Sequence, residues 1–181
     1  MRNTGRVDLP TLRDGDLLLR PKTPGDAEAL VAACQDPEIP RWTLVPSPYT
    51  RADADHFIAL SEQEAAAGTG AHLIAVDAGD GRLLGSFSVM ELDRQPGYGE
   101  IGYWVAAGAR GRGIATRAVR LLTDWARSEL GLTRIEILPH KDNAPSRRVA
   151  EKAGYRDTGR LVPPPREEHA EPVFMVYASD G

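Results

Sequence analysis

The segment 109-ARGRGIAT-116 places glycines and arginines between an apolar run, 101-IGYWV-105, and a stretch with helical spacing. Glycine lets the backbone turn tightly and lets a bound group approach it closely. The first N–H groups of a helix have no partner inside the helix and carry partial positive charge. The segment therefore predicts a cradle for phosphate at a helix start. The alternative is a tight turn with solvated arginines.

Two common phosphate-binding patterns do not fit this segment. A Walker loop requires G-x-x-x-x-G-K-[ST], and the chain has no such run. A dinucleotide loop requires G-x-G-x-x-G or a small third residue. Gly111 and Gly113 supply its first two positions, but Thr116 stands at the third. An acidic residue should also end the next strand, whereas Glu136 lies in the middle of the expected one.

A third pattern, [QR]-x-x-G-x-[GA], is met by Arg110, Gly113 and Ala115. At these residues the sequence resembles the GCN5-related N-acetyltransferase family, in which this loop wraps the pyrophosphate of acetyl-CoA. The preceding run, 100-EIGYWV-105, looks like the fourth strand of that family. Many relatives carry Glu at the position of Arg117, where a cation could contact phosphate or face water.

Further motifs of this resemblance occur in the expected order along the chain. The run 143-NAPSRRVAEKAGYRDTG-159 is similar to the N-x-x-S-x-x-x-x-x-K-x-G-[FY] signature of the ribosomal-protein N-terminal acetyltransferase branch. Two earlier runs, 17-LLLRPKTPGDAEAL-30 and 36-DPEIPRWT-43, also look like that branch. The resemblance therefore covers nearly the whole chain, from about Leu17 to Tyr177.

The resemblance implies acetyl-CoA as acyl donor and direct attack by an amine on the thioester, without a covalent enzyme intermediate. It also implies that the family's fourth and fifth strands splay apart and admit pantetheine. Backbone groups of the fourth strand bind it, an N–H near Val105 polarises the thioester carbonyl, and Leu138 and Pro139 form the other wall. The implied cofactor-binding residues are Trp104, Val105, Arg110, Gly111, Arg112, Gly113, Ala115, Thr116, Asn143 and Ser146.

Three side chains are candidates for holding the cofactor and moving protons. Asn143 matches the first residue of the signature and also suits a helix N-cap. Ser146 could protonate the leaving thiolate, or could contact backbone at a helix start. Glu100 is the leading general base, acting on the amine through water; a strand-end carboxylate paired with arginine is the alternative. His72 and His140 stand in reserve as bases.

The acceptor is expected on the side of 41-RWTLVPSPY-49 and 163-PPPREEHAE-171. Trp42 and Tyr49 offer aromatic walls, and Glu100 lies nearby. The acidic loop, with Glu167, Glu168 and Glu171, favours a cationic amine or is simply solvated. The leading acceptor is the α-amine of a protein or peptide. A small antibiotic or metabolite amine, or a non-catalytic acyl-CoA-binding module, is the alternative.

Composition excludes several other classes of function. A formal net charge of −4 disfavours a nucleic-acid binder. The single cysteine, Cys34, excludes an internal disulfide, and the four histidines lack metal-ligand spacing. No apolar run suits a membrane span, and the N-terminus lacks a signal-peptide core, so a cytoplasmic protein is expected. A homodimer is compatible with such a chain.

The elements that position these residues follow from hydrophobic periodicity. The expectation is one α/β (α+β) domain over 17–178 after a polar arm, 1–16. It has a central mixed, mostly antiparallel sheet of about six or seven strands and about four flanking helices. The passage 37–49 is expected to be irregular. Strands are expected at 17–21, 72–77, 83–92, 99–106, 133–138, 155–162 and 172–178, and helices at 25–35, 51–67, 113–130 and 143–153.

Overall fold

The computed structural model describes residues 5–165 and 170–181, and its centre is one mixed sheet of eight strands. Their order across the sheet is β1-β2-β3-β4-β5-β6-β8-β7, and every neighbouring pair is antiparallel except β5 and β6. The strands are β1 (Leu12–Asp14), β2 (Leu17–Pro21), β3 (Ala71–Asp77), β4 (Leu83–Asp93), β5 (Tyr98–Val105), β6 (Arg134–Ile137), β7 (Arg156–Val162) and β8 (Phe174–Asp180).

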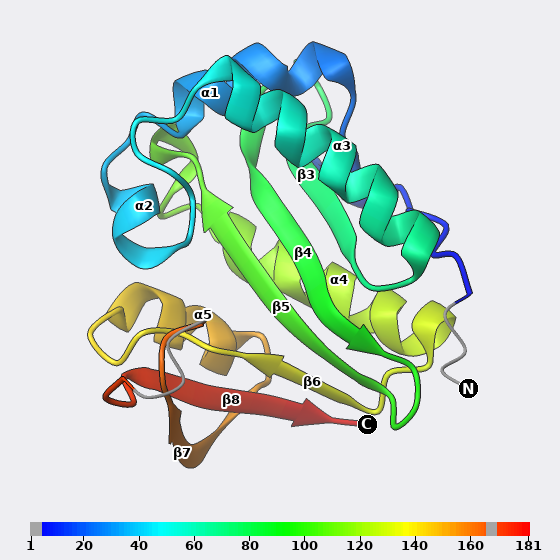
Figure 1. The fold of residues 1–181 in the computed structure, drawn as a ribbon, viewed down its shortest axis with the longest axis vertical. Helices are drawn as coiled ribbons and strands as arrows, with labels where there is room; N and C mark the ends of the chain where they lie inside the picture. The colour runs from blue at the N-terminus through cyan, green and yellow to red at the C-terminus, as the bar shows by residue number, and fades with distance from the viewer. Residues whose placement is uncertain (1–4, 166–169) are drawn as a thin grey trace.

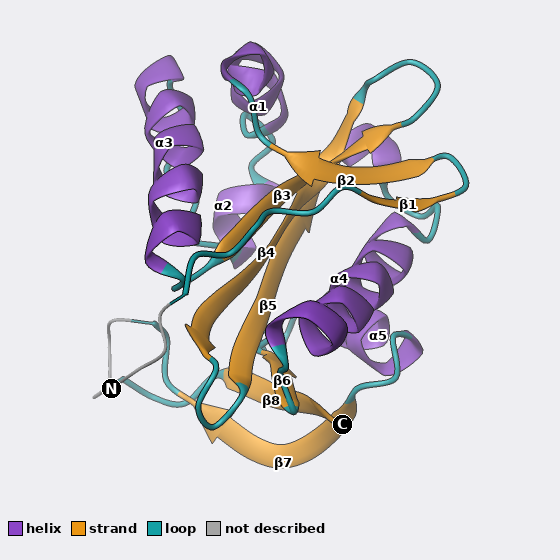
Figure 2. Cartoon of the chain, turned by 90° about the vertical axis from the view of Figure 1, so that its right-hand side faces the viewer, coloured by secondary structure: helices purple, strands orange, loops and turns teal. Residues whose placement is uncertain are grey.

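Helices cover both faces of this sheet, as Figures 1 and 2 show. The first three lie over one face, and the last two lie over the other. Short 3₁₀ turns at Pro24–Asp26 and Ala107–Ala109 precede α1 and α4. The helices are α1 (Ala27–Ala33), α2 (Glu38–Trp42), α3 (Arg51–Ala67), α4 (Ile114–Leu130) and α5 (Ala144–Lys152). No helix within the described ranges is long and apolar enough to span a membrane.

Each face of the sheet has its own apolar core. The larger core packs α4 against β4 and β5 and includes the fully buried Leu122, Phe87 and Ile101. The smaller core lies under α1 and α3 and includes Ile74 and Trp104. Side chains alternate between faces along a strand, so successive residues of β5 point into different cores. Neighbouring residues of β5, such as Tyr103 and Trp104, therefore lie on opposite faces of the sheet.

The predicted fold class is confirmed, and most predicted elements lie within a few residues of the observed ones. Two differences stand out. A short strand, β1, lies inside 1–16 and pairs with β2, because Leu12 and Leu19 are register partners at a hairpin. The passage 37–49 was expected to be irregular, which is wrong for α2. Pro37 stands at the N-cap of α2, where a missing N–H costs nothing.

Candidate functional site

An opening separates β5 from β6 in the middle of the sheet. The two strands pair only where Tyr98–Glu100 meets Arg134–Glu136. Beyond Glu100, β5 continues to Val105 without pairing to β6, which ends at Ile137, and Figure 1 shows the two strands diverging. The expected splay of these two strands is thus confirmed. It exposes a strand edge whose backbone groups can bind an extended ligand.

The alternation of ladder hydrogen bonds decides which backbone groups face this opening. The Ala106 N–H donates to the Leu84 carbonyl at 2.9 Å, so even-numbered residues of β5 bond to β4. Trp104 therefore directs both backbone groups to β4, and its side chain is buried in the smaller core. The residues that face the opening are Tyr103 and Val105. Trp104 as a pantetheine-binding residue conflicts with this geometry, whereas Val105 agrees with it.

The loop before α4 presents unsatisfied N–H groups beside the opening. Within the described chain, no backbone or side-chain acceptor bonds to the N–H groups of residues 111–116, and the first helical bond runs from the Arg117 N–H to the Gly113 carbonyl at 3.1 Å. Gly111 and Gly113 adopt φ values of 74° and 75°, which a side chain would strain. This arrangement suits a polyanion such as pyrophosphate.

The three arginines around this loop have different surroundings. Arg110 turns away from the free N–H groups: its Nε donates to the Val105 carbonyl at 3.1 Å, and its Nη2 lies 2.7 Å from Asp36 Oδ2. Arg117 joins α4 to the β1–β2 turn through Asp14 at 2.7 Å and Asp16 at 2.9 Å. Arg112 is exposed beside the loop. Of the three, Arg112 alone forms no ion pair within the described residues.

A hydroxyl pair lies on the α5 side of β5. Tyr103 Oη and Ser146 Oγ are 2.9 Å apart, and burial raises the pKa of Tyr103 to about 12. Asn143 caps α5 by accepting the Ser146 N–H at 3.2 Å, so its side chain performs the helix-capping role. Tyr103 was missed from sequence. Its position one residue before Trp104 places it on the opposite face of the strand, and this alternation was the available signal.

Carboxylates gather on the other face of β5. Glu100 is the register partner of Met90 on β4 and of Glu136 on β6. Burial raises the pKa of Glu100 to about 7, with further contributions from the negative charges of Glu91 and Glu136. A carboxylate with this pKa exchanges protons near neutral pH, as a general base requires. The expected alternative, pairing with an arginine, is not observed among the described residues.

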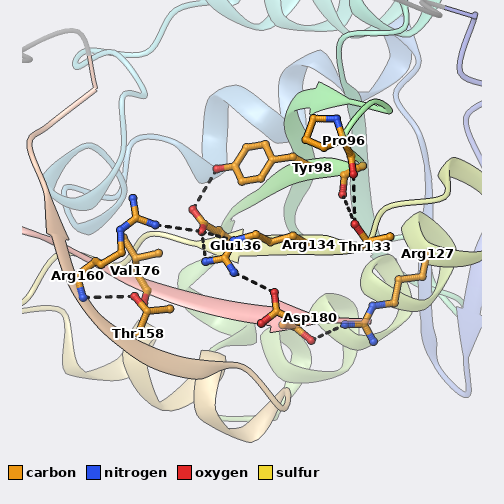
Figure 3. A network of polar contacts seen from close by, with 12 residues as sticks. Pro96, Tyr98, Arg127, Thr133, Arg134, Glu136, Thr158, Arg160, Val176 and Asp180 are labelled. Carbon is orange, nitrogen blue, oxygen red and sulfur yellow. Dashed lines mark hydrogen bonds and ion pairs between the residues drawn. The ribbon is translucent and has the colours of Figure 1, made fainter.

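Glu136 is held by the polar network that Figure 3 shows. Its carboxylate accepts hydrogen bonds from Arg134 Nε at 2.9 Å and from Tyr98 Oη at 3.2 Å. Arg160 approaches the same carboxylate at 3.6 Å. The basic partners are therefore committed to Glu136, and Glu100 remains the acidic group of this face with an elevated pKa.

The two aromatic residues expected to wall the acceptor, Trp42 and Tyr49, lie in different surroundings. The ring of Trp42 lies 5.5 Å from that of His140, which lies 5.5 Å from that of Phe174, so an aromatic row joins α2 to β8. Tyr49, in contrast, is only 6% exposed and packs in the smaller core, so it has no surface to offer an acceptor. Glu167 and Glu168 lie outside the described residues.

The reserve histidines have separate surroundings. His72 is buried between Ser88 Oγ, 2.8 Å from its Nδ1, and Glu64 Oε2, 2.6 Å from its Nε2. Burial lowers the pKa of His72, and it serves to join α3 to the sheet. His140 lies 3.7 Å from Asp142 at the aromatic row. No group of His, Cys, Asp and Glu within the described ranges could hold a metal ion.

Comparison with known families decides the class of the chain. The family described as Acetyltransferase (GNAT) domain matches residues 16–156. The chain belongs to the GNAT acetyltransferase family. The match covers β2 through α5 and so includes the glycine loop, the opening and the hydroxyl pair.

Curated GNAT relatives match parts of the chain. The Bacillus subtilis protein YdaF, which carries the words ribosomal N-acetyltransferase in its name, is 40% identical over 93 residues, covering 50% of this chain and 51% of YdaF. YjcK of the same organism, named a probable N-acetyltransferase, is 41% identical over 91 residues, covering 49% of each chain. The matched stretch thus spans about half the length of these relatives.

Solved GNAT structures share the fold along nearly the whole chain. Mycobacterium smegmatis RimJ in complex with CoA-disulfide superposes with a TM-score of 0.79 at 23% identity, covering 96% of this chain and 87% of RimJ. The ribosomal-protein-S5-alanine acetyltransferase of Vibrio fischeri gives 0.81 at 18% identity, covering 94% and 96%. At these identities the likeness shows the fold alone.

Proposed function

We propose that this chain transfers the acetyl group of acetyl-CoA to a primary amine, with the N-terminal α-amine of a protein or peptide as the leading acceptor. One observation carries the proposal: the free N–H groups of residues 111–116 lie beside the opening between β5 and β6. A pyrophosphate bound at those N–H groups would direct the pantetheine arm along the free edge of β5. The loop at residues 111–116 and the opening between β5 and β6 would then form one continuous site for acetyl-CoA.

The cofactor site consists of backbone groups more than side chains. Gly111, Gly113 and the N–H groups that follow them, through Ala115 and Thr116, would hold the pyrophosphate. Val105 would donate its N–H to the thioester carbonyl, where negative charge develops during attack. Asn143 retains its cap and fixes the start of α5, which positions Ser146. Acetyl-CoA would supply the activated acyl group.

The two proton transfers would take place on opposite faces of β5. Glu100 would take a proton from the acceptor amine through water, since its pKa of about 7 lets it act as a base near neutral pH. The pair formed by Tyr103 and Ser146 would return a proton to the leaving thiolate from the other face. A base and an acid on opposite faces of one strand can act on the two sides of the reacting carbon without neutralising each other.

The acceptor would enter between the aromatic row and the carboxylates. Trp42 forms part of the wall, and Glu100 lies on the face that the amine must reach. The acidic character of this face favours a cationic amine. The word ribosomal in the name of YdaF is consistent with a protein acceptor.

Isothermal titration with acetyl-CoA, beside NADH and ATP, tests donor binding. Binding of acetyl-CoA alone is expected. An acceptor screen read by thiol release then compares peptides with free N-termini, the same peptides with blocked N-termini, and polyamines. Turnover that requires the free α-amine supports a protein acceptor. Turnover with polyamines alone replaces that acceptor by a small amine, and binding without any turnover would indicate a non-catalytic acyl-CoA-binding module.

A further inference from the structure

Lys22 is a buried lysine outside the proposed active site, and it forms no ion pair with a carboxylate of residues 5–165 or 170–181. Lys22 follows β2, and its residue is only 6% exposed beneath α3. Its Nζ donates to Ser61 Oγ at 3.2 Å and lies 4.1 Å from the centre of the Phe57 ring. The nearby carboxylates are occupied: Asp26 pairs with Arg20 at 2.8 Å, and Glu64 pairs with His72 at 2.6 Å.

The hydrogen bonds around Lys22 leave the nitrogen lone pair available when the amine is neutral. Ser61 Oγ donates its own proton to the Phe57 carbonyl at 2.8 Å, so toward Lys22 it acts as an acceptor. Because Nζ lies over the Phe57 ring, a second N–H can be directed at that ring. A neutral amine has one further direction, its lone pair, and neither of these contacts uses it.

Lys22 and Ser61 line a cavity of about 550 Å³ between α3, the end of β2 and the N-terminal segment 6–9. The Val7 N–H bonds to the Ala65 carbonyl at 2.8 Å and holds that segment over the cavity. The volume falls in the range of small-molecule sites, which is roughly 300–1,000 Å³. Its other charged residues are Arg6, Asp8 and Glu62.

Lys22 differs from the other basic residues of the chain in being a buried lysine. Of the 22 Lys and Arg residues, the lysines are Lys22, Lys141 and Lys152. Arginine stays protonated in proteins, whereas lysine can lose its proton when it is desolvated. Burial lowers the pKa of Lys22 to about 7, opposed in part by the charges of Asp26 and Glu64. Lys141 and Lys152 are exposed.

We propose that Lys22 is a modification site whose amine accepts a short acyl group from an acyl thioester that enters this cavity. The Nζ lone pair attacks the thioester carbonyl carbon, a C–N bond forms and the C–S bond breaks. The thiolate leaves with the electron pair of that bond and takes the proton that Nζ releases. The products are an N-acyl-lysine and a thiol, with no oxidant or metal involved.

The test uses the whole protein and N-acetyl-S-acetylcysteamine, a thioester that lacks the nucleotide of CoA. Peptide mass spectrometry follows acylation of Lys22, Lys141 and Lys152 at pH 7. Lys22 should react about tenfold or more faster than the other two, because a larger fraction of its amine is neutral. Equal or slower reaction at Lys22 overturns the proposal. Since this probe does not need the phosphate-binding loop, the result is independent of the proposed function.

Two variants test whether the cavity is the route. Ala66 lines the cavity and is exposed, so Ala66→Leu should narrow the cavity without disturbing either core. This variant should slow acylation of Lys22 about fivefold or more and leave Lys141 and Lys152 unchanged, since access and not basicity is altered. An unchanged rate at Lys22 contradicts the cavity route. In urea, the preference for Lys22 should vanish, since burial sets its pKa.

Discussion

Two helices of equal length begin in opposite ways. Both α3 and α4 contain 17 residues, and they lie on opposite faces of the sheet. At the start of α3, Thr50 accepts the Asp53 N–H while Asp53 accepts the Thr50 N–H, a complete capping box. At the start of α4, Gly113 provides no side-chain cap, and the N–H groups of residues 111–116 lack acceptors in the described structure.

The difference shows how one chain separates folding from binding. Unsatisfied N–H groups at a helix start lower stability unless solvent or a ligand satisfies them. The start of α3 satisfies them with its own side chains and so stabilises the helix. The start of α4 leaves them open beside the gap between β5 and β6, and α4 is instead anchored by Arg117 to Asp14 and Asp16. We therefore expect substitutions at the two starts to affect different measurements.

The largest effect is expected from a carboxylate placed in the open start. Thr116→Asp puts a negative charge in the first turn of α4, which favours the helix dipole but repels pyrophosphate. The dissociation constant for acetyl-CoA should rise about 100-fold, with little loss of thermal stability. Titration calorimetry and thermal unfolding of the same sample measure the two quantities.

Thr116→Asn is the matched control, because it keeps the size and polarity and adds no charge. Its affinity for acetyl-CoA should stay within about threefold of the original chain. A similar loss in both variants would mean that shape, and not charge, accounts for the effect. No loss in either variant would place the phosphate elsewhere and remove the functional contrast between the two helix starts.

The next effect concerns the acidic face of β5. Glu100→Gln should lower kcat by about 30-fold while acetyl-CoA affinity is kept, since a missing general base affects the chemical step. In the original chain, activity should rise with pH through about 7, because the pKa of Glu100 is raised to about 7 and only its ionised form accepts a proton. This rise should disappear in Glu100→Gln. If the activity of Glu100→Gln still rose with pH through about 7, the general base would be another group.

A smaller effect is expected from the hydroxyl pair on the opposite face. Tyr103→Phe removes one hydroxyl and leaves Ser146, and Ser146→Ala does the reverse, so the two variants identify the proton donor. The donor's variant should lose about tenfold in kcat and the other about threefold. With acetyl thioesters whose thiol is a poorer leaving group, the difference in kcat between the two variants should increase. Equal, small losses would mean that solvent protonates the thiolate.

The sequence predicted most of this arrangement because local patterns determine it. The helices expected at 51–67 and 113–130 are confirmed, and their boundaries are set by local features, the capping box at Thr50 and the C-cap at Gly131. Tyr103 was missed because its partner Ser146 is 43 residues away and lies on another element. Arg110 belonged to the loop motif, yet its side chain pairs with Asp36, and only the tertiary structure brings those two together.

The smallest effect tests the closed helix start. Thr50→Ala removes the side chain that accepts the Asp53 N–H, and such a loss costs about 1 kcal/mol of unfolding free energy. Urea denaturation should show this shift in midpoint with an unchanged slope. Affinity for acetyl-CoA should be unaffected, because α3, whose N-cap is Thr50, lies on the face of the sheet opposite α4. Thr50→Ser is the control and should retain the cap. If Thr50→Ala weakened acetyl-CoA binding while Thr50→Ser did not, the start of α3 would be coupled to the donor site, and the separation of folding from binding would be wrong.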